Sequence, residues 1–424
     1  MSNTGSLSGA GESLTRRKRD FRLFWIGQII SSLGSTFTSF ALPLLAFKIT
    51  HSAFELGLTF MTTVLPYLLF GFVIGAWVDR LNRKYVMLLT DILRAATIAC
   101  IPLLNVIGSL SIWWIYGITF ISATLSIGFD AASFAIVPSL IPKEELVAAN
   151  SRIGVSYSLT SIIGPLLAAL LLLVLPVSKL FLGDAFSFLL SAGSIFFILR
   201  REQTRASDEQ QKRDTTTLKD IEEGLRYIWQ HTFLRWLMFL ILLVNLVVPT
   251  IYAQFVLFAK EVLFTTDSQL SILYTAEGVG VVIVSLMANT LTKKFSASRV
   301  LIGSLMLQGS LIVFLALLHN YVAALFLWGA CLGLSSLFNI IVYSLGQLIV
   351  PEHLLGRVVI FARVITWSSS PLGVLLGSWL IEKTNNVALV YTGIGVLCFL
   401  IPVFFLFTPV ITSIEQFLPK NSRK

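Results

Sequence analysis

Long stretches that contain no Asp, Glu, Lys or Arg set the strongest limit on how this chain can fold. Four of them run over residues 23–47, 56–78, 153–178 and 236–259. The hydrocarbon core of a bilayer is about 30 Å thick, and a helix needs about 20 apolar residues to cross it. Of the 424 residues, 56% are hydrophobic and only 12% are charged, against roughly 25% charged in a soluble domain. The chain is therefore predicted to be an integral membrane protein, with the lipid bilayer as its surroundings.

The longer apolar regions contain turn-like breaks at 105–108, 319–320 and 382–386, so each divides into a pair of helices. The predicted fold is an all-α membrane protein with twelve transmembrane helices in two pseudo-symmetric six-helix bundles. The expected helices are 22–47, 54–78, 85–106, 111–138, 151–174, 179–199, 234–258, 268–291, 299–318, 321–349, 358–381 and 387–411.

The basic residues predict the orientation of these helices. Among 31 Lys and Arg residues, only Lys48, Lys179, Lys260 and Lys383 fall on one side, and Arg94 lies within a span. Cytoplasmic loops carry an excess of Lys and Arg. We therefore expect a multi-pass protein of the cell membrane with cytoplasmic N- and C-termini. The net charge of +9 fits such loops better than it fits a nucleic-acid partner.

One long hydrophilic segment divides the chain into halves. The expected parts are a cytoplasmic tail (1–21), a first bundle (22–199), a cytoplasmic central loop (200–233), a second bundle (234–411) and a second cytoplasmic tail (412–424). Apolar residues at helical spacing in 218–229 favour an amphipathic surface helix over a bare linker. Residues 141–146 resemble 350–355 at the corresponding place in the second half, and the same offset pairs Lys84 with Lys293. Parallel six-helix repeats are typical of transporters.

The loop after the second helix reads Gly75-Ala76-Trp77-Val78-Asp79-Arg80-Leu81-Asn82-Arg83-Lys84. It resembles motif A of the major facilitator superfamily, although Asn82 stands where the motif has a second Gly. The resemblance implies a major facilitator fold and a cytoplasmic gate made by Gly75, Asp79, Arg80, Arg83 and Lys84. In this gate, Gly75 would allow close helix approach, Asp79 would attract basic groups, and the basic residues would hold the loop at the surface. The alternative is an ordinary basic loop.

Shorter stretches resemble the drug-antiporter branch of this superfamily, which includes macrolide efflux proteins and siderophore exporters. They cover residues 21–28, 41–43, 184–188, 223–228 and 356–358, in order along the chain. Gly154, Gly164 and Pro165 in the fifth helix resemble the antiporter-associated motif C, with Ala168 and Ala169 in place of glycines. A proline bends a helix and small residues let neighbours slide past it. Plain helix packing is an equal alternative for this kink.

A charged group in hydrocarbon costs about 2.5–3.5 kcal/mol or more, so each one is a functional candidate. Asp91 and Arg94 lie three residues apart and are expected to form an intramembrane ion pair that braces the loop. Asp130 and Glu277 are the candidates for carrying a proton. For each of these two, a carboxyl that is hydrogen-bonded to a neighbouring helix, or that faces a vestibule, is an equal alternative.

Polar side chains among aromatic ones predict a cavity for an amphipathic or apolar small molecule. The candidates are Gln28, Asn245, Gln254, Asn339 and Trp367. The four His residues are scattered in loops, so we expect no metal site. No Gly-x-x-x-x-Gly-Lys-[Ser/Thr] loop is present, which argues against ATP hydrolysis. We expect no cofactor and no enzymatic activity.

The leading hypothesis is a secondary transporter, functional as a monomer, that exports amphipathic drug-like or macrolide-like molecules by alternating access. Proton antiport as its energy source is implied by the resemblance. One alternative is a siderophore or lipid exporter with the same fold. Another is a membrane receptor that does not transport, or a membrane enzyme, because fold does not fix function.

Overall fold

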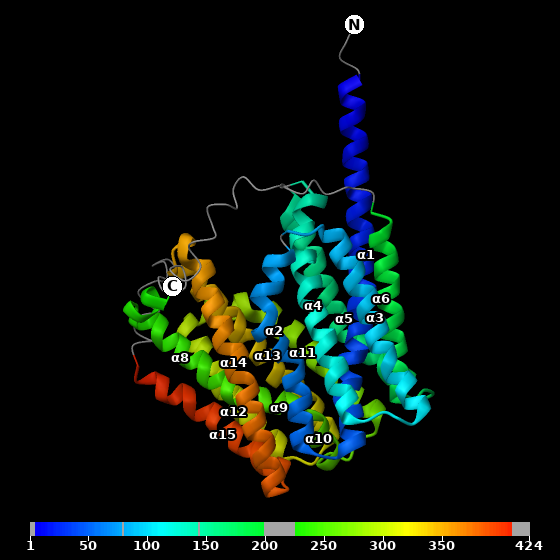
Figure 1. Cartoon of the computed structure of the whole chain (residues 1–424). Coiled ribbons are helices and arrows are strands. Elements are labelled where there is room, and N and C mark those ends of the chain that lie inside the picture. The colour runs from blue at the N-terminus through cyan, green and yellow to red at the C-terminus, as the bar shows by residue number, and fades with distance from the viewer. Residues whose placement is uncertain (1–4, 79, 143–144, 199–224, 409–424) are drawn as a thin grey trace. The chain divides into compact units, whose positions relative to one another are not determined.

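The computed structural model describes residues 5–78, 80–142, 145–198 and 225–408, and helices make up the regular structure of these ranges (Figure 1). Within them, 12 helical segments are long and apolar enough to cross a membrane. The prediction of an all-α protein with twelve spans is confirmed. Predicted and observed ends agree to within a few residues for most helices.

The first six spans use α1 to α6. Their bounds are α1 Gly5–Thr50, α2 Ala53–Val78, α3 Arg83–Ile107, α4 Ile112–Leu140, α5 Leu146–Leu171 and α6 Leu180–Phe196, with a 3₁₀ turn at Val177–Lys179 before α6. The remaining spans use α8 Thr232–Val247 with α9 Pro249–Ala253, α11 Asp267–Lys294, α12 Ala297–Leu317, α13 Tyr321–Ile349, α14 Glu352–Thr384 and α15 Val387–Leu406. The short helix α10 Phe255–Glu261 follows α9.

The chain forms two compact units. Unit 1 comprises Met1–Thr50 and Thr62–Ala206, and unit 2 comprises His51–Met61 and Ser207–Lys424. The sequence analysis assigned residues 51–61 to the first bundle, whereas the structure groups them with the second. The reason is local, because the first turns of α2 pack on α14 and on the break between α9 and α10.

Three helix contacts of unit 1 recur at the matching places of unit 2. In unit 1, α1 packs on α5, and α3 packs on both α4 and α6. In unit 2, α8 packs on α14, and α12 packs on both α13 and α15. Pro142 and Pro351 precede the matching helices α5 and α14. The close packing of α11 on α13 has no equally close counterpart between α2 and α4, so the two units repeat each other in part.

The predicted breaks between helices coincide with capping residues. Gly108 ends α3 in the left-handed conformation with φ 75°, which glycine adopts without steric cost. The side chains of Asn320 and Asn386 accept hydrogen bonds from the N–H groups of Ala323 and Leu389 at the starts of α13 and α15. An asparagine at the N-cap satisfies one of the free N–H groups of a helix, so these breaks could be predicted locally.

The seventh span differs from the prediction. One helix over 234–258 was expected, but the structure breaks it into α8, α9 and α10. Pro249 occupies the first turn of α9, where its missing N–H breaks the helical ladder. Gln254 stands between α9 and α10 with φ −99° and ψ 7°. The break lets the side chain of Gln254 enter the interior of unit 2, where its exposure is 0%.

The ends of the chain also differ from the expected parts. Helix α1 begins at Gly5, inside the segment expected to be a tail. Most of the expected surface helix over 218–229 lies outside the described residues, of which 225–230 are helical. The expected tail over 412–424 lies outside them as well.

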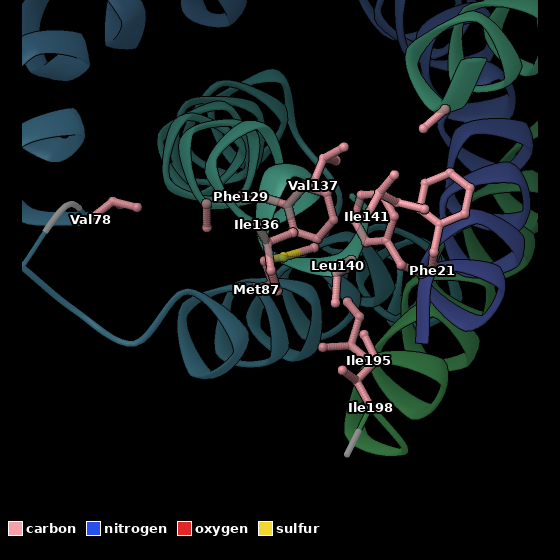
Figure 2. Close-up of a cluster of buried hydrophobic side chains, with 13 residues drawn as sticks. Phe21, Val78, Met87, Phe129, Ile136, Val137, Leu140, Ile141, Ile195 and Ile198 are labelled. Atoms are coloured by element: carbon pink, nitrogen blue, oxygen red, sulfur yellow. The ribbon is translucent and has the colours of Figure 1, made fainter. Parts of the chain in front are cut away.

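A cluster of buried apolar side chains closes one end of unit 1 (Figure 2). Phe21 comes from α1, Met87 from α3, Phe129 and Leu140 from α4, and Ile195 from α6. Phe21 and Phe24 are 2% and 1% exposed, which explains why the 21–28 stretch carries aromatic residues at this spacing. The cluster lies beside the loop between α2 and α3, because Val78 and Met87 flank that loop.

We predict that Met87→Ala destabilises unit 1 by about 2–5 kcal/mol, because removing a fully buried side chain leaves a cavity in the cluster. The exposure of Met87 is 0%. Thermal unfolding of the purified chain in detergent measures the effect. The control Leu89→Ala lies on the same helix at 56% exposure and should change stability by about 0.5 kcal/mol or less. Equal effects of the two substitutions would contradict the cluster.

Candidate functional site

The basic residues of the loop after α2 bind helix ends within unit 1. The Arg83 guanidinium donates to the carbonyl oxygen of Ala135 in α4 at 3.1 Å. The Lys84 ammonium donates to the carbonyls of Phe196 and Ile198 at 2.9 and 2.6 Å. The last carbonyls of a helix have no partner in the helix and attract positive charge. Lys84 thus caps α6 and ties it to the start of α3.

The structure describes part of the remaining motif A-like segment. Asp79 lies outside the described residues, and Arg80 is exposed. A Cβ atom placed on Gly75 would meet nothing within 4 Å, so the described residues show no close helix approach at this glycine. Asn82, which stands where the motif has a second Gly, has φ −70° and caps α3 by accepting from the N–H of Tyr85 at 3.3 Å.

The motif C-like residues of α5 have different surroundings. A Cβ atom on Gly164 would collide with the side chain of Thr36 in α1, so Gly164 is required for the close packing of α5 on α1. Pro165 follows inside the same helix. A Cβ atom on Gly154 would lie in open space. Helix packing therefore accounts for Gly164, and the structure of unit 1 assigns no contact to Gly154.

Arg94 is the centre of a charged cluster inside unit 1. Its guanidinium lies 4.0 Å from the carboxylate of Asp91, which is fully buried. The guanidinium also lies 4.0 Å from the ring centroid of Phe188 and 5.8 Å from that of Phe129. A guanidinium over an aromatic face is stabilised by the ring quadrupole, more so away from water. Asp91 and Arg94 lie three residues apart on α3, and the expected ion pair between them is present.

Two further carboxylates face Arg94 from neighbouring helices. Asp184 in α6 is 1% exposed, accepts hydrogen bonds from the hydroxyls of Thr38 and Ser187, and interacts with the charge of Arg94. Asp130 in α4 is exposed, accepts from the hydroxyl of Tyr67 at 3.2 Å and also interacts with Arg94. Nothing near Asp130 in the sequence neutralises its charge. In the structure, the positive charge of Arg94 in α3 acts on it.

Glu277 lies half-buried on α11, one turn before the place where α11 and α13 touch. A Cβ atom on Gly280 would collide with the backbone of Gly329, and one on Gly333 would lie 2.6 Å from the carbonyl of Gly280. This contact brings Trp328 next to Glu277. The indole N–H of Trp328 has no regular hydrogen bond to any group in the part of the chain that the structure describes.

Trp328 belongs to a cluster of aromatic rings in unit 2. Trp328 stacks on Phe255 with ring centroids 3.6 Å apart, and Phe255 meets Tyr274 edge-on at 5.6 Å. Tyr252 contacts Trp328 and donates to the hydroxyl of Ser335 at 2.7 Å. The sequence analysis missed Trp328, Phe255 and Tyr274. The Gly329-x-x-x-Gly333 spacing, a known signal of helix contact, marks the place on α13.

The five cavity candidates divide between the two units, with Gln28 in unit 1 and the other four in unit 2. Gln28 in unit 1 accepts from the Tyr157 hydroxyl at 3.3 Å. The side chains of Asn245 and Asn339 donate to carbonyls of their own helices, and Trp367 is half-buried on α14. Gln254 was expected in a cavity, but it is fully buried and donates to Ala53 and Ser378. Among the described residues, no group of three His, Cys, Asp or Glu side chains could hold a metal ion.

Comparison with known proteins establishes the family. Residues 14–421 match the model of a family described as transmembrane secretion effectors of the major facilitator type. The chain belongs to this family. Macrolide efflux protein A of Streptococcus pyogenes is 24% identical to it over 91% of this chain and 96% of the relative. Multidrug efflux pump Tap of Mycolicibacterium fortuitum is 26% identical over 88% and 92%. The resemblance to the drug-efflux branch is confirmed.

Solved structures of other transporters share the fold of this family member. The nucleoside transporter NupG, as its D323A mutant, aligns with a TM-score of 0.74 and 13% identity over 91% of this chain and 99% of NupG. A bacterial homologue of the human lysosomal transporter Spinster aligns with a TM-score of 0.69 and 14% identity over 96% and 98%. The chain is thus a multi-pass membrane transporter with the major facilitator fold and not an enzyme.

We predict that Lys84→Met loosens the end of α6, because the two carbonyls it caps lose a charged donor. The expected cost is about 1–2 kcal/mol, the scale for hydrogen bonds to a partly exposed charged group. Hydrogen–deuterium exchange at residues 194–198 should accelerate, and the melting temperature in detergent should fall. Tyr85→Phe, at a residue with 68% exposure, serves as the control. Unchanged hydrogen–deuterium exchange in Lys84→Met would contradict the role of Lys84 as a cap of α6.

Proposed function

We propose that the chain is a proton-coupled efflux transporter that exports amphipathic small molecules by alternating access, with both termini in the cytoplasm. The family match over residues 14–421 and the efflux relatives support the direction and the substrate class. The proton coupling is argued from two intramembrane carboxyls, Asp130 in unit 1 and Glu277 in unit 2. Each interacts with polar or charged side chains of its own unit.

In unit 1, Asp130 is suited to take up and release a proton. Its carboxylate accepts from the Tyr67 hydroxyl, and its negative charge interacts with Arg94. Protonation would remove the attraction of Asp130 for Arg94. The guanidinium would then favour the buried carboxylates of Asp91 on the same helix and Asp184 on α6. A proton bound at α4 would thus change the contacts of α3 and α6.

In unit 2, Glu277 is suited to meet both a proton and a substrate. It interacts with the indole N–H of Trp328 and with the hydroxyl of Tyr274, and Trp328 is stacked on Phe255. Aromatic rings bind apolar and ring-containing molecules, and a carboxylate beside them favours a cationic group over a neutral one. A molecule with an apolar body and a basic amine would compete with a proton for Glu277. Such competition couples export of the molecule to entry of the proton.

The first experiment reconstitutes the purified chain in liposomes with a trapped pH dye and an imposed proton gradient. Cationic, macrolide-like and anionic compounds are added in turn. Compound-dependent movement of protons, strongest with amphipathic cations, is expected. Binding of a compound without movement of protons would contradict proton coupling and leave uniport or another coupling ion.

We predict that Glu277→Gln and Asp130→Asn each abolish proton-driven accumulation, because neither amide can carry a proton. The loss should be at least about tenfold, the scale expected when a proton-transfer group is removed. Exchange of substrate across liposomes without a gradient should persist. Glu145→Gln removes an exposed carboxyl that pairs with Lys18 and is the matched control. Equal loss of exchange and accumulation would assign the residue to structure or substrate binding.

A further inference from the structure

Aromatic side chains gather in unit 2 where α8 begins and α15 ends. The ring centroid of Trp236 in α8 lies 6.2 Å from that of Phe404 and 5.9 Å from that of Phe405 in α15. Phe239, one turn further along α8, lies 6.1 Å from Phe405. Phe405 is fully buried, whereas Phe404 and Phe239 are 52% and 40% exposed. The buried ring of Phe405 therefore holds a group of aromatic rings at the surface of the unit.

A guanidinium stands at the edge of these rings. Arg235 lies in the first turn of α8, next to Trp236, and is exposed. Its side chain donates to the carbonyl of Trp229 at 3.4 Å. Helices α8 and α15 contain no Asp or Glu, and Arg235 pairs with no carboxylate in the part of the chain that the structure describes. Its remaining N–H groups can bind an anion from outside the protein.

The turn that leads into α8 adds a tryptophan at the same end. Trp229 is 65% exposed, whereas Ile228 beside it is 2% exposed and fixes the turn on unit 2. The N–H of His231 donates to the carbonyl of Tyr227 at 3.1 Å, which closes the turn. Tryptophan is enriched where a membrane meets water. We call Trp229, Arg235, Trp236, Phe239 and Phe404 the α8 patch.

The α8 patch has the layers of a phospholipid. The membrane spans run over Thr232–Ala253 and Val387–Leu406, so Arg235 stands at the depth of the headgroups and Phe239 lies deeper. A guanidinium binds a phosphate through two parallel hydrogen bonds. Exposed aromatic rings below it offer an apolar surface to an acyl chain. Basic groups beside membrane-spanning helices are known to bind anionic headgroups.

The charges around the α8 patch favour an anionic lipid over a second copy of the chain. Lys293, Lys294 and Arg299 lie where α11 ends and α12 begins, and all three are exposed. Each span crosses the membrane once, so these residues are on the same side of the membrane as Arg235. Two copies joined by the same face would bring both sets of positive charges to that side, which is unfavourable. The same charges attract a negative headgroup.

We propose that the α8 patch binds an anionic phospholipid, with the phosphate on Arg235 and an acyl chain over the rings of Trp236 and Phe404. The proposal concerns a binding site for lipid, and its tests use neither the proposed substrate nor the proton gradient.

The first test identifies the lipid that lies beside the α8 patch. Leu400→Cys places a reporter one turn before Phe404 on α15, at a position with 51% exposure, and Cys100→Ser removes the exposed native cysteine. The reporter carries a benzophenone maleimide in liposomes of equal dioleoylphosphatidylglycerol and dioleoylphosphatidylcholine. After irradiation, mass spectrometry should find about fivefold more phosphatidylglycerol than phosphatidylcholine adducts, the preference expected from one basic residue near anionic lipid.

Arg235→Gln should bring this ratio of adducts close to one. Arg152→Gln removes an exposed arginine from α5 of unit 1 and is the matched control, which should keep the preference. A second reporter, Phe314→Cys at 56% exposure near the other end of α12, should show no preference.

A preference that survives Arg235→Gln, or that falls equally in Arg152→Gln, would overturn the proposal. Equal labelling of the two lipids in the chain that keeps Arg235, or an equal preference at Phe314→Cys, would overturn it as well. Adducts with a second copy of the chain in place of lipid would assign the patch to a contact between copies.

The second test measures binding without a bilayer. A ligand that binds the folded chain raises its melting temperature by mass action. Phosphatidylglycerol added to the purified chain in neutral detergent should raise the Tm more than phosphatidylcholine does. Arg235→Gln should lose most of this difference, and Arg152→Gln should keep it. An equal difference in Arg235→Gln would overturn the proposal. A rise produced by inorganic phosphate alone would assign Arg235 to a free anion and overturn the lipid site.

Discussion

The structure depends on one constraint, that backbone N–H and C=O groups in lipid find partners inside the protein. Helices meet it, so this apolar chain folds into helices over nearly all of its described length. Where a helix breaks inside a unit, side chains must supply the partners. The break after Pro249 leaves Gln254 at the junction of α9 and α10, and its amide binds the carbonyl of Ala53. A defect in one helix thus holds the first turn of another.

Because lipid is apolar, a charged side chain within the membrane depends on neighbouring groups for its stabilisation. Arg94 is held by the Asp91 carboxylate and by the ring of Phe188, and it faces two further carboxylates. Unit 1 therefore concentrates its charges around one cation. Unit 2 keeps Glu277 among aromatic rings instead. The two units therefore stabilise their intramembrane charges by different means.

Local chemistry explains why the twelve spans could be predicted. Each predicted break carries a residue that stops or starts a helix by itself, such as Gly108, Asn320 or Asn386. The break at Gln254 carries no such signal, because a glutamine is a good helix former. Gly75 shows the converse, since the motif predicted a close helix contact there, and a Cβ atom at Gly75 would meet none of the described residues within 4 Å. A motif names the residue types of a site, but the neighbour across the contact comes from another helix.

The sequence by itself determined the membrane location, the number of spans, the repeat and the family, because these rest on apolar length and on motifs along the chain. Only the tertiary structure decided which groups meet. It brought the charges of Arg94 and Asp130 within range of each other, placed Trp328 beside Glu277, and grouped the start of α2 with the second unit. The reason is that apolar helix surfaces look alike in sequence. Helix partners are chosen by the fit of small residues and by the few polar groups that must be satisfied.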